Sequence, residues 1–321
     1  MENALYFPFI SVPESPWFTR ILLYWDQVGS IIPFEFVDAP ERLTKYTREL
    51  LTDELLIQIH PGQYVWQAPR FKDAFVDFVG SLSNGDISQR HRAFLNNRTS
   101  RIHTEKMQDV ADYLVEKGLA KGVNWSWCDV ESKTAAEFMG YLAAILGKLE
   151  DVKSTPVTDI ASNLDPFLLA SQSGGRTEAR LAPLRKLVLE QLLPVPEQPV
   201  SPSKLRFFKQ KHGGLLRNFR HRIEQEIAAI ADMTDPELQD HRLENFIAEK
   251  TDERDQITAR LSESGLGAVV FSKVCAVIAA IPRAHSLFGL ANAVYSAFSG
   301  SRQQPGSGAF LYAAFVKKEL V

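Results

Sequence analysis

Three carboxylates near the amino terminus, Asp26, Glu35 and Asp38, are the first residues whose type and spacing could carry out acid–base chemistry. They accompany an apolar run, a short helical pattern and a second apolar run, the order that a βαβ unit has. Side chains at strand ends in α/β domains often do chemistry, and paired carboxylates can act as general acid and general base. The competing interpretation is structural, because Asp26 directly follows the aromatic pair 24–25 and would end a helix beside the core. We favour the structural interpretation and keep the three carboxylates as catalytic candidates.

The segment 204–222 has the sharpest local charge pattern. It contains no acid, two histidines, three interleaved phenylalanines and seven basic residues: Lys204, Arg206, Lys209, Lys211, Arg217, Arg220 and Arg222. Basic side chains neutralise phosphates and aromatic rings stack on bases. The pattern therefore predicts a surface that binds nucleic acid, another polyanion or a protein partner.

An intramolecular interpretation competes with this one. The following segment, 235–263, carries nine acids and four Lys or Arg. If the chain folds back between the two segments, Lys211 falls near Asp255, and Arg217 falls near residues 250–253. Each exposed pair of this kind contributes only ~0–1 kcal/mol, but together the pairs neutralise the basic face. We favour the intramolecular pairing over a surface that stays open to a partner.

The segment 264–298 is rich in Ala, Gly and Val. Its charge-capable side chains are Lys273, Arg283 and His285, and Pro282 divides it into two apolar halves. A helix that spans a bilayer needs about 20 apolar residues, and neither half reaches that length. The pattern favours a helical hairpin buried in a protein core. The alternative is a hairpin that inserts into a membrane on activation, with its small residues allowing close helix packing.

Other motifs for catalysis or cofactor binding do not occur in the sequence. The stretch 140–149 only superficially resembles a phosphate-binding loop, because six residues separate its glycines and a leucine follows its lysine. Cys128 and Cys275 lie far apart, the seven histidines lack metal-ligand spacing, and Gly-x-Ser-x-Gly does not occur. We therefore expect no metal site and no cofactor, and we favour a non-enzymatic protein.

The first elements of the chain have clear signals. The run 5–10 favours a strand, and the run 28–32 favours a second strand. Between them, Ser15 is placed to cap a helix whose first residue is Pro16. A strand, a short helix and a strand predict a parallel pair of strands.

The next hundred residues predict mostly helix. We expect helices over 40–56, 104–118 and 131–150, with Gly118 ending the second of these. The segment 81–100 is polar, and we expect it to be irregular.

The carboxyl-terminal half predicts helices joined by a stiff linker. A helix over 177–193 leads into 194–202, where four prolines indicate an extended connection and a domain boundary. After it, apolar residues recur at helical spacing, interrupted by the glycine pair 213–214, where the helix could kink. Asp235 is placed to cap a second helix, so 203–263 predicts a long antiparallel α-hairpin.

The composition is that of an ordinary globular protein. The chain has 321 residues, a formal net charge of -3 and two cysteines, which favours a reducing compartment. The first residues lack the pattern of a signal peptide, so we expect a cytoplasmic protein. The fold class that we predict is α+β and mainly α, with an α/β portion followed by a helical portion. Its parts are an α/β domain (1–125), a helical connector (126–193), the Pro-rich linker (194–202), the charged α-hairpin (203–263) and an apolar helical segment (264–321).

The opening strings Leu5-Tyr6-Phe7-Pro8, Leu23-Tyr24-Trp25-Asp26 and Ile31-Ile32-Pro33 resemble those of a family of bacterial proteins of unknown function. Similar strings lie at 155–159, 193–196 and 208–220, so the resemblance covers the chain to about residue 265. It implies a bacterial origin and carries over no site residue. It also implies a loose association with defence-like gene neighbourhoods.

Three functional hypotheses follow. The leading one is a non-enzymatic interaction or effector protein, part of a bacterial anti-phage or toxin-like system, that contacts a protein partner through the hairpin. The second is an enzyme on a nucleic-acid or phosphorylated substrate, which would use the three carboxylates and bind the anion through Arg90, Arg92, Arg98 and Arg101. The third is a membrane-active effector that uses 264–298.

Overall fold

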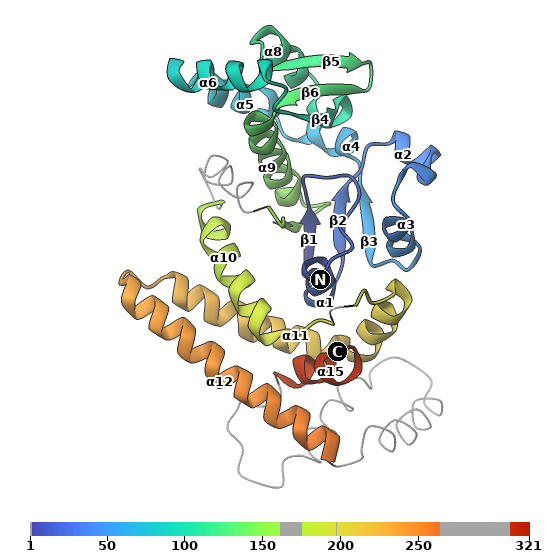
Figure 1. Ribbon diagram of the computed structural model, residues 1–321, viewed down its shortest axis with the longest axis vertical. Coiled ribbons are helices and arrows are strands. Elements are labelled where there is room, and N and C mark those ends of the chain that lie inside the picture. Colours follow the sequence, from blue (N-terminus) through green and yellow to red (C-terminus); the bar gives the residue numbers. More distant parts are fainter. Residues whose placement is uncertain (1, 161–174, 197, 264–308) are drawn as a thin grey trace. The chain divides into compact units, whose positions relative to one another are not determined.

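The protein is an α+β, mainly helical chain that divides into two compact units, Met1–Ala179 and Arg180–Val321. A computed structural model describes residues 2–160, 175–196, 198–263 and 309–321 (Figure 1). The predicted fold class is confirmed. The predicted boundary at 194–202 lies inside the second unit, and the predicted end of the α/β domain near 125 lies inside the first.

A parallel sheet forms the base of the first unit. Its strands are β1 (Asn3–Tyr6), β2 (Val28–Ile31), β3 (Leu56–Ile59) and β7 (Ser154–Val157), in the order β3-β2-β1-β7. The predicted parallel pair is confirmed, with Leu5 opposite Gly29. The crossover from β1 to β2 is α1 (Pro16–Tyr24), and Ser15 caps it by accepting a hydrogen bond from the Phe18 amide at 3.2 Å.

The connection from β2 to β3 differs from the expected helix over 40–56. It contains α2 (Glu35–Asp38), a 3₁₀ turn (Pro40–Arg42) and α3 (Lys45–Thr52), after which the chain turns and enters β3. The turn requires a positive φ of 57° at Glu54, which ends the helix before the strand begins. The prediction of one helix over 40–56 was therefore wrong in its bounds. Good helix formers precede β3 in the sequence, and they made the helix look longer than it is.

A long insertion separates β3 from β7. Its helices are α4 (Pro61–Tyr64), α5 (Phe71–Gly80), α6 (Asn84–Leu95), α7 (Thr104–Met107), α8 (Val110–Glu116) and α9 (Ser132–Lys148). An antiparallel sheet runs among them in the order β4-β6-β5, formed by β4 (Thr99–His103), β5 (Ala120–Asn124) and β6 (Trp127–Glu131). In Figure 1 the inserted elements lie beyond the carboxyl ends of β1, β2 and β3.

Two expectations for this insertion were wrong. The segment 81–100 is not irregular throughout, since it holds α6, which Ser83 caps by accepting from the Asp86 amide at 3.1 Å. The helix expected over 104–118 is two helices, because Gln108 adopts a φ of 47° between them. Gly118 does end the second of them, with a φ of 68°.

The insertion is held together by an aromatic core between α5 and α9. Phe75 and Phe138 meet edge to face at 5.2 Å, and Phe71 stacks on Tyr141 at 5.4 Å. The Tyr141 hydroxyl also donates to the Phe71 carbonyl at 2.8 Å. This core fixes α9 as the scaffold against which the rest of the insertion packs.

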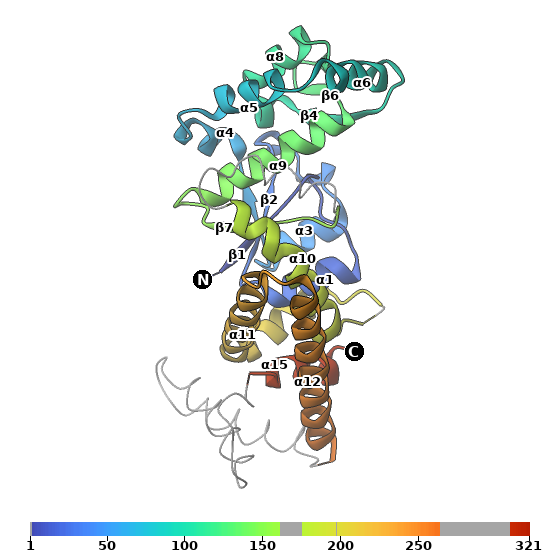
Figure 2. The same ribbon diagram turned by 90° about the vertical axis from the view of Figure 1, so that its left-hand side faces the viewer.

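The second unit is helical and contains the predicted hairpin (Figure 2). Its described helices are α10 (Gly175–Leu192, which begins in the first unit), α11 (Pro202–Ala231), α12 (Pro236–Glu263) and α15 (Leu311–Glu319). Asp235 accepts from the Glu237 amide at 3.0 Å and so caps α12 as predicted. The pair 213–214 does not interrupt α11, which runs through it as one helix.

Arg242 of α12 pairs with Glu226 of α11, as the predicted pairing of the two long helices requires. The sequence did not predict further ion pairs to α15, which packs against both α11 and α12. Lys211 pairs with Glu319 at 2.8 Å, and Asp255 pairs with Lys317 at 2.9 Å, so both charges contact α15. The segment 264–298, with Cys275, lies outside the described residues. Within the described part, no helix is both long and apolar enough to cross a membrane.

Candidate functional site

The carboxyl edge of the parallel sheet is where this topology favours a ligand site. In open α/β sheets, ligands bind outside the carboxyl ends of the strands, where the strand order reverses. The order β3-β2-β1-β7 reverses beside β1, which continues into the loop Pro8–Ser11. The insertion brings the start of α7 to the same edge, through contacts of Glu105 with the loops after β2 and β3.

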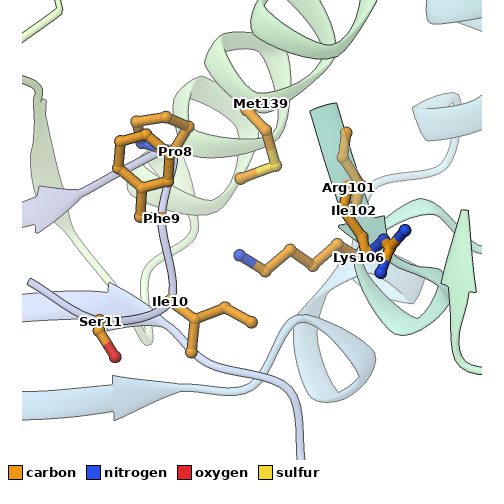
Figure 3. Close-up of a pocket in the computed structure, with 8 residues that line it drawn as sticks. All are labelled: Pro8, Phe9, Ile10, Ser11, Arg101, Ile102, Lys106 and Met139. Atoms are coloured by element: carbon orange, nitrogen blue, oxygen red, sulfur yellow. The ribbon is translucent and has the colours of Figure 1, made fainter. Parts of the chain in front are cut away.

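A cavity of about 420 Å³ opens at this edge. Its walls come from four parts of the chain, namely the loop after β1, β4, α7 and α9 (Figure 3). The lining residues are Pro8, Phe9, Ile10, Ser11, Arg101, Ile102, Lys106 and Met139. Its volume lies in the range of small-molecule pockets, and most of these side chains are apolar.

Lys106 is the polar residue whose side chain enters the cavity. Its side chain reaches into the space bounded by Phe9, Ile10 and Met139 (Figure 3), although the residue is only 2% exposed. Its amino group forms no hydrogen bond or ion pair with any residue that the structure describes. Burial disfavours the charged form and lowers the pKa of Lys106 to about 7, while the charge of Glu105 opposes this shift. A substantial fraction of this amine is therefore neutral near pH 7.

Glu105 holds the helix that carries Lys106. Its carboxylate accepts hydrogen bonds from the Phe34 amide at 2.7 Å and from the Gly62 amide at 3.4 Å. The contact is close enough that a Cβ on Gly62 would lie 3.2 Å from Glu105 Oε1, so glycine suits this position. The carboxylate beside Lys106 in the sequence thus accepts from amides that follow β2 and β3 and forms no ion pair with the amine.

His103 lies at the start of α7, next to this anchor. Its Nδ1 accepts from the Glu105 amide at 3.2 Å, so in the neutral ring the proton is on Nε2, which lies 3.2 Å from Glu35 Oε1. Burial lowers the pKa of His103 and outweighs the opposing charge of Glu35. Arg42 lies 3.1 Å from the same Glu35 oxygen. Burial thus favours the neutral form of His103, whose Nε2 lies beside Glu35 of α2 without forming a hydrogen bond.

Arg101 also lines the cavity, but its charge is already compensated. The guanidinium donates to both carboxylate oxygens of Asp129, at 2.8 and 3.2 Å. These hydrogen bonds raise the pKa of Arg101 further above its ordinary value. Arg101 is thus a weaker candidate than Lys106 for a ligand's polar group.

The three candidate carboxylates do not meet. Asp26 precedes β2 and accepts from the Glu2 amide at 2.8 Å, which places it at the amino edge of the sheet. Glu35 and Asp38 follow β2, at the carboxyl edge, where Asp38 is exposed at the end of α2. Glu35 lies beside a titratable group of the acid–base kind, His103.

Arg90 and its neighbours form no shared anion site. Arg90 is buried and donates to Glu137 at 2.6 and 3.0 Å, and to Thr134 at 2.9 Å. Arg92 and Arg98 are both exposed. Together with the pairing of Arg101, this placement removes the geometric basis for a common phosphate pocket.

The seven basic residues of 204–222 are distributed around α11. Lys204, Arg217 and Arg222 are exposed, whereas Arg220 is buried. The other three are half-buried: Arg206, Lys209 and Lys211. The exposed basic residues lie on a helix whose apolar face is covered. That they bind a polyanion stays a prediction.

Sequence reasoning did not single out Lys106 or His103. Both lie in the string 103–106, between β4 and α7, and Lys106 comes four residues before the buried Val110. A lysine at helical spacing from an apolar stripe was a signal that could have marked it. The sequence could not show that the loop 8–11, which is distant from Lys106 along the chain, lines the same cavity.

Comparison of the chain with protein-family models, with curated proteins and with solved structures finds no match. The resemblance of the opening strings to a bacterial family therefore stays a prediction. Among the residues that the structure describes, no group of three or more His, Cys, Asp or Glu could hold a metal ion.

Proposed function

We propose that the first unit binds a small organic molecule in the cavity at the carboxyl edge of its parallel sheet. The ligand's polar head group contacts Lys106, and its hydrocarbon part packs on Phe9, Ile10 and Met139. The observation that carries this proposal is the buried amine of Lys106, which faces the cavity without a protein partner. A group of this kind is costly to bury, and a strongly perturbed pKa in a cavity is a mark of functional sites.

Methionine methyl groups offer a direct measurement. The chain has four methionines, of which Met139 lines the cavity and Met233 lies in the second unit. In a protein labelled with ¹³C at the methionine methyls, short-chain carboxylates, amides and ketones of four to six carbons serve as probes. We expect at least one class to shift the Met139 signal in a saturable way while the Met233 signal stays fixed.

A variant that narrows the cavity provides the control. Ile10→Trp places a larger side chain on the loop that lines the cavity. It should abolish the Met139 shift and leave the spectrum otherwise folded. If the probes shift Met139 equally in wild type and in Ile10→Trp, or shift no signal at all, the cavity is not a ligand site.

We propose, second, that the hairpin makes contacts with a protein partner, the function that its charge pattern predicts. The observation in favour is an exposed acidic face on α12, where Glu237, Asp240 and Glu244 recur at helical spacing. Retention of the full chain on polylysine and on heparin distinguishes a basic from an acidic partner. Retention on neither column in low salt would contradict a charged docking face.

A further inference from the structure

The cavity presents an unusual set of polar groups for the small molecule proposed above. A site built for an anion brings several donors together, as helix amino termini and Arg pairs do. Here the amine of Lys106 is the donor that reaches the interior, and the guanidinium of Arg101 is paired with Asp129. The neighbouring carboxylate, Glu105, is engaged by backbone amides. The geometry suits a nucleophile in an apolar pocket better than a charge clamp.

We propose that Lys106 binds its ligand covalently, as an imine with an aldehyde or ketone group. This inference rests on the proposed function, because it needs a small molecule in the same cavity. It names the ligand class: a small carbonyl compound whose carbon skeleton fits between Phe9, Ile10 and Met139.

The chemical step balances without an oxidant or a reductant. The lone pair of neutral Lys106 Nζ attacks the carbonyl carbon, and the C=O π electrons move to oxygen, which takes up a proton. Nζ loses a proton, and the resulting carbinolamine is protonated on oxygen. Its C–O bond then breaks and water leaves as the nitrogen lone pair forms the C=N bond. The iminium nitrogen finally gives up its proton to solvent, which returns the proton taken up before. The net change is one amine and one carbonyl giving one imine and one water.

The electrostatic environment supports this step. An amine must be neutral to attack, and burial among apolar side chains lowers the pKa of Lys106 to about 7. An exposed lysine has a pKa of ~10.4, so at pH 7 the neutral fraction of Lys106 is larger by roughly a thousandfold. Acetylating or alkylating reagents would therefore react faster with Lys106 than with exposed lysines. A carbonyl probe, in contrast, tests the proposed C=N bond itself.

Pentane-2,4-dione is the probe of choice. It condenses with a neutral amine, loses one water and gives a conjugated enaminone that absorbs in the near ultraviolet, so no reductant is needed. The full chain is mixed with the dione at pH 7, and the adduct is followed by absorbance and by intact mass. Peptide mapping then locates it. We expect one adduct per chain, on Lys106, forming at least ~10 times faster than on exposed lysines.

Two variants and one control make the result specific. Lys106→Met keeps the length and apolar character of the side chain and should abolish the absorbance. Ile10→Trp keeps Lys106 but narrows the cavity, and it should slow the adduct at least tenfold. Lys121→Met removes an exposed lysine of β5 and should change nothing. Adducts spread over exposed lysines, or an unmodified Lys106, would overturn the proposal.

The outcome also separates this proposal from the one on which it rests. If ketone-free probes shift the Met139 signal but the dione leaves Lys106 unmodified, the cavity binds ligands without forming an imine. If neither the Met139 signal nor Lys106 responds to any probe, both proposals are wrong. An adduct on Lys106 that Ile10→Trp suppresses supports both.

Discussion

Replacing Lys106 by methionine should increase the stability of the first unit, and the increase should be larger at pH 7 than at pH 9. Folding moves the pKa of this lysine from 10.5 to about 7, because burial penalises the ammonium form more than the charge of Glu105 favours it. Between those values the unfolded chain binds more protons than the folded chain. The free energy of unfolding of the wild type therefore rises with pH over this window. Methionine has no proton to lose, so its contribution is constant.

The magnitude follows from proton linkage. With pKa values of 10.5 unfolded and about 7 folded, burying the amine costs about 4 kcal/mol at pH 7 and about 2 kcal/mol at pH 9. The advantage of Lys106→Met over the wild type should thus shrink by about 2 kcal/mol between the two pH values. Loss of the methylene packing is small, since a methionine side chain has nearly the same length and adapts to irregular gaps.

Tryptophan fluorescence reports this change selectively, because all five tryptophans of the chain lie in the first unit. Urea unfolding of the wild type, Lys106→Met and the exposed control Lys121→Met is followed at pH 7 and pH 9. The control should track the wild type at both values. A difference between Lys106→Met and the wild type that is the same at both pH values would show that Lys106 keeps an ordinary pKa in the folded chain. The account of the cavity would then be wrong.

Three further substitutions test the other contacts. Glu105→Ala should destabilise the first unit by about 1–2 kcal/mol in the same fluorescence assay, because two backbone amides lose their acceptor; an unchanged urea midpoint would contradict its anchoring role. Arg90→Met should cost about 3–5 kcal/mol, since it leaves Glu137 buried without its partner. Adding Glu137→Leu should recover much of that loss, and equal stability of the single and double variants would refute the pairing. For Glu319→Gln, burial opposes ionisation of the native carboxyl, but hydrogen bonds from residues 211 and 212 outweigh it and lower its pKa. Thermal melts by circular dichroism should show that this variant is less stable than the wild type at neutral pH. The difference should disappear as the pH falls through the lowered pKa of Glu319. A difference that is independent of pH would exclude the ion pair as its cause.

The helices whose starts the sequence predicted correctly have a local capping signal at that end. Ser15 and Pro16 mark the start of α1, and Asp235 marks the start of α12. Neither signal depends on distant residues, because a cap is a contact between near neighbours in the chain. The parallel pairing of β1 with β2 followed from the short helix between them, since a crossover connection favours parallel strands.

The elements that were missed depend on tertiary contacts. β3 has four residues and follows good helix formers, so its identity comes from pairing with β2. The ion pairs of Lys211 and Asp255 with α15 were missed because α15, more than fifty positions beyond Asp255, packs against both long helices. Ion-pair partners on a helix hairpin can be assigned from register only when no third helix packs against the two.

The cavity illustrates the same limit for function. Lys106 and Met139 belong to the insertion, whereas Ile10 follows the first strand, and no local pattern joins these positions. The cost of burying the Lys106 amine can be recognised only from the folded structure. A lysine of ordinary role would pair with the adjacent carboxylate, yet Glu105 is turned to the amides after β2 and β3. Methionine in place of Lys106 would fill the same space without the cost of desolvating a charge. Retaining the amine against that cost is reasonable only if the cavity uses it, which is why the stability of Lys106→Met and the reactivity of Lys106 are two measurements of one property.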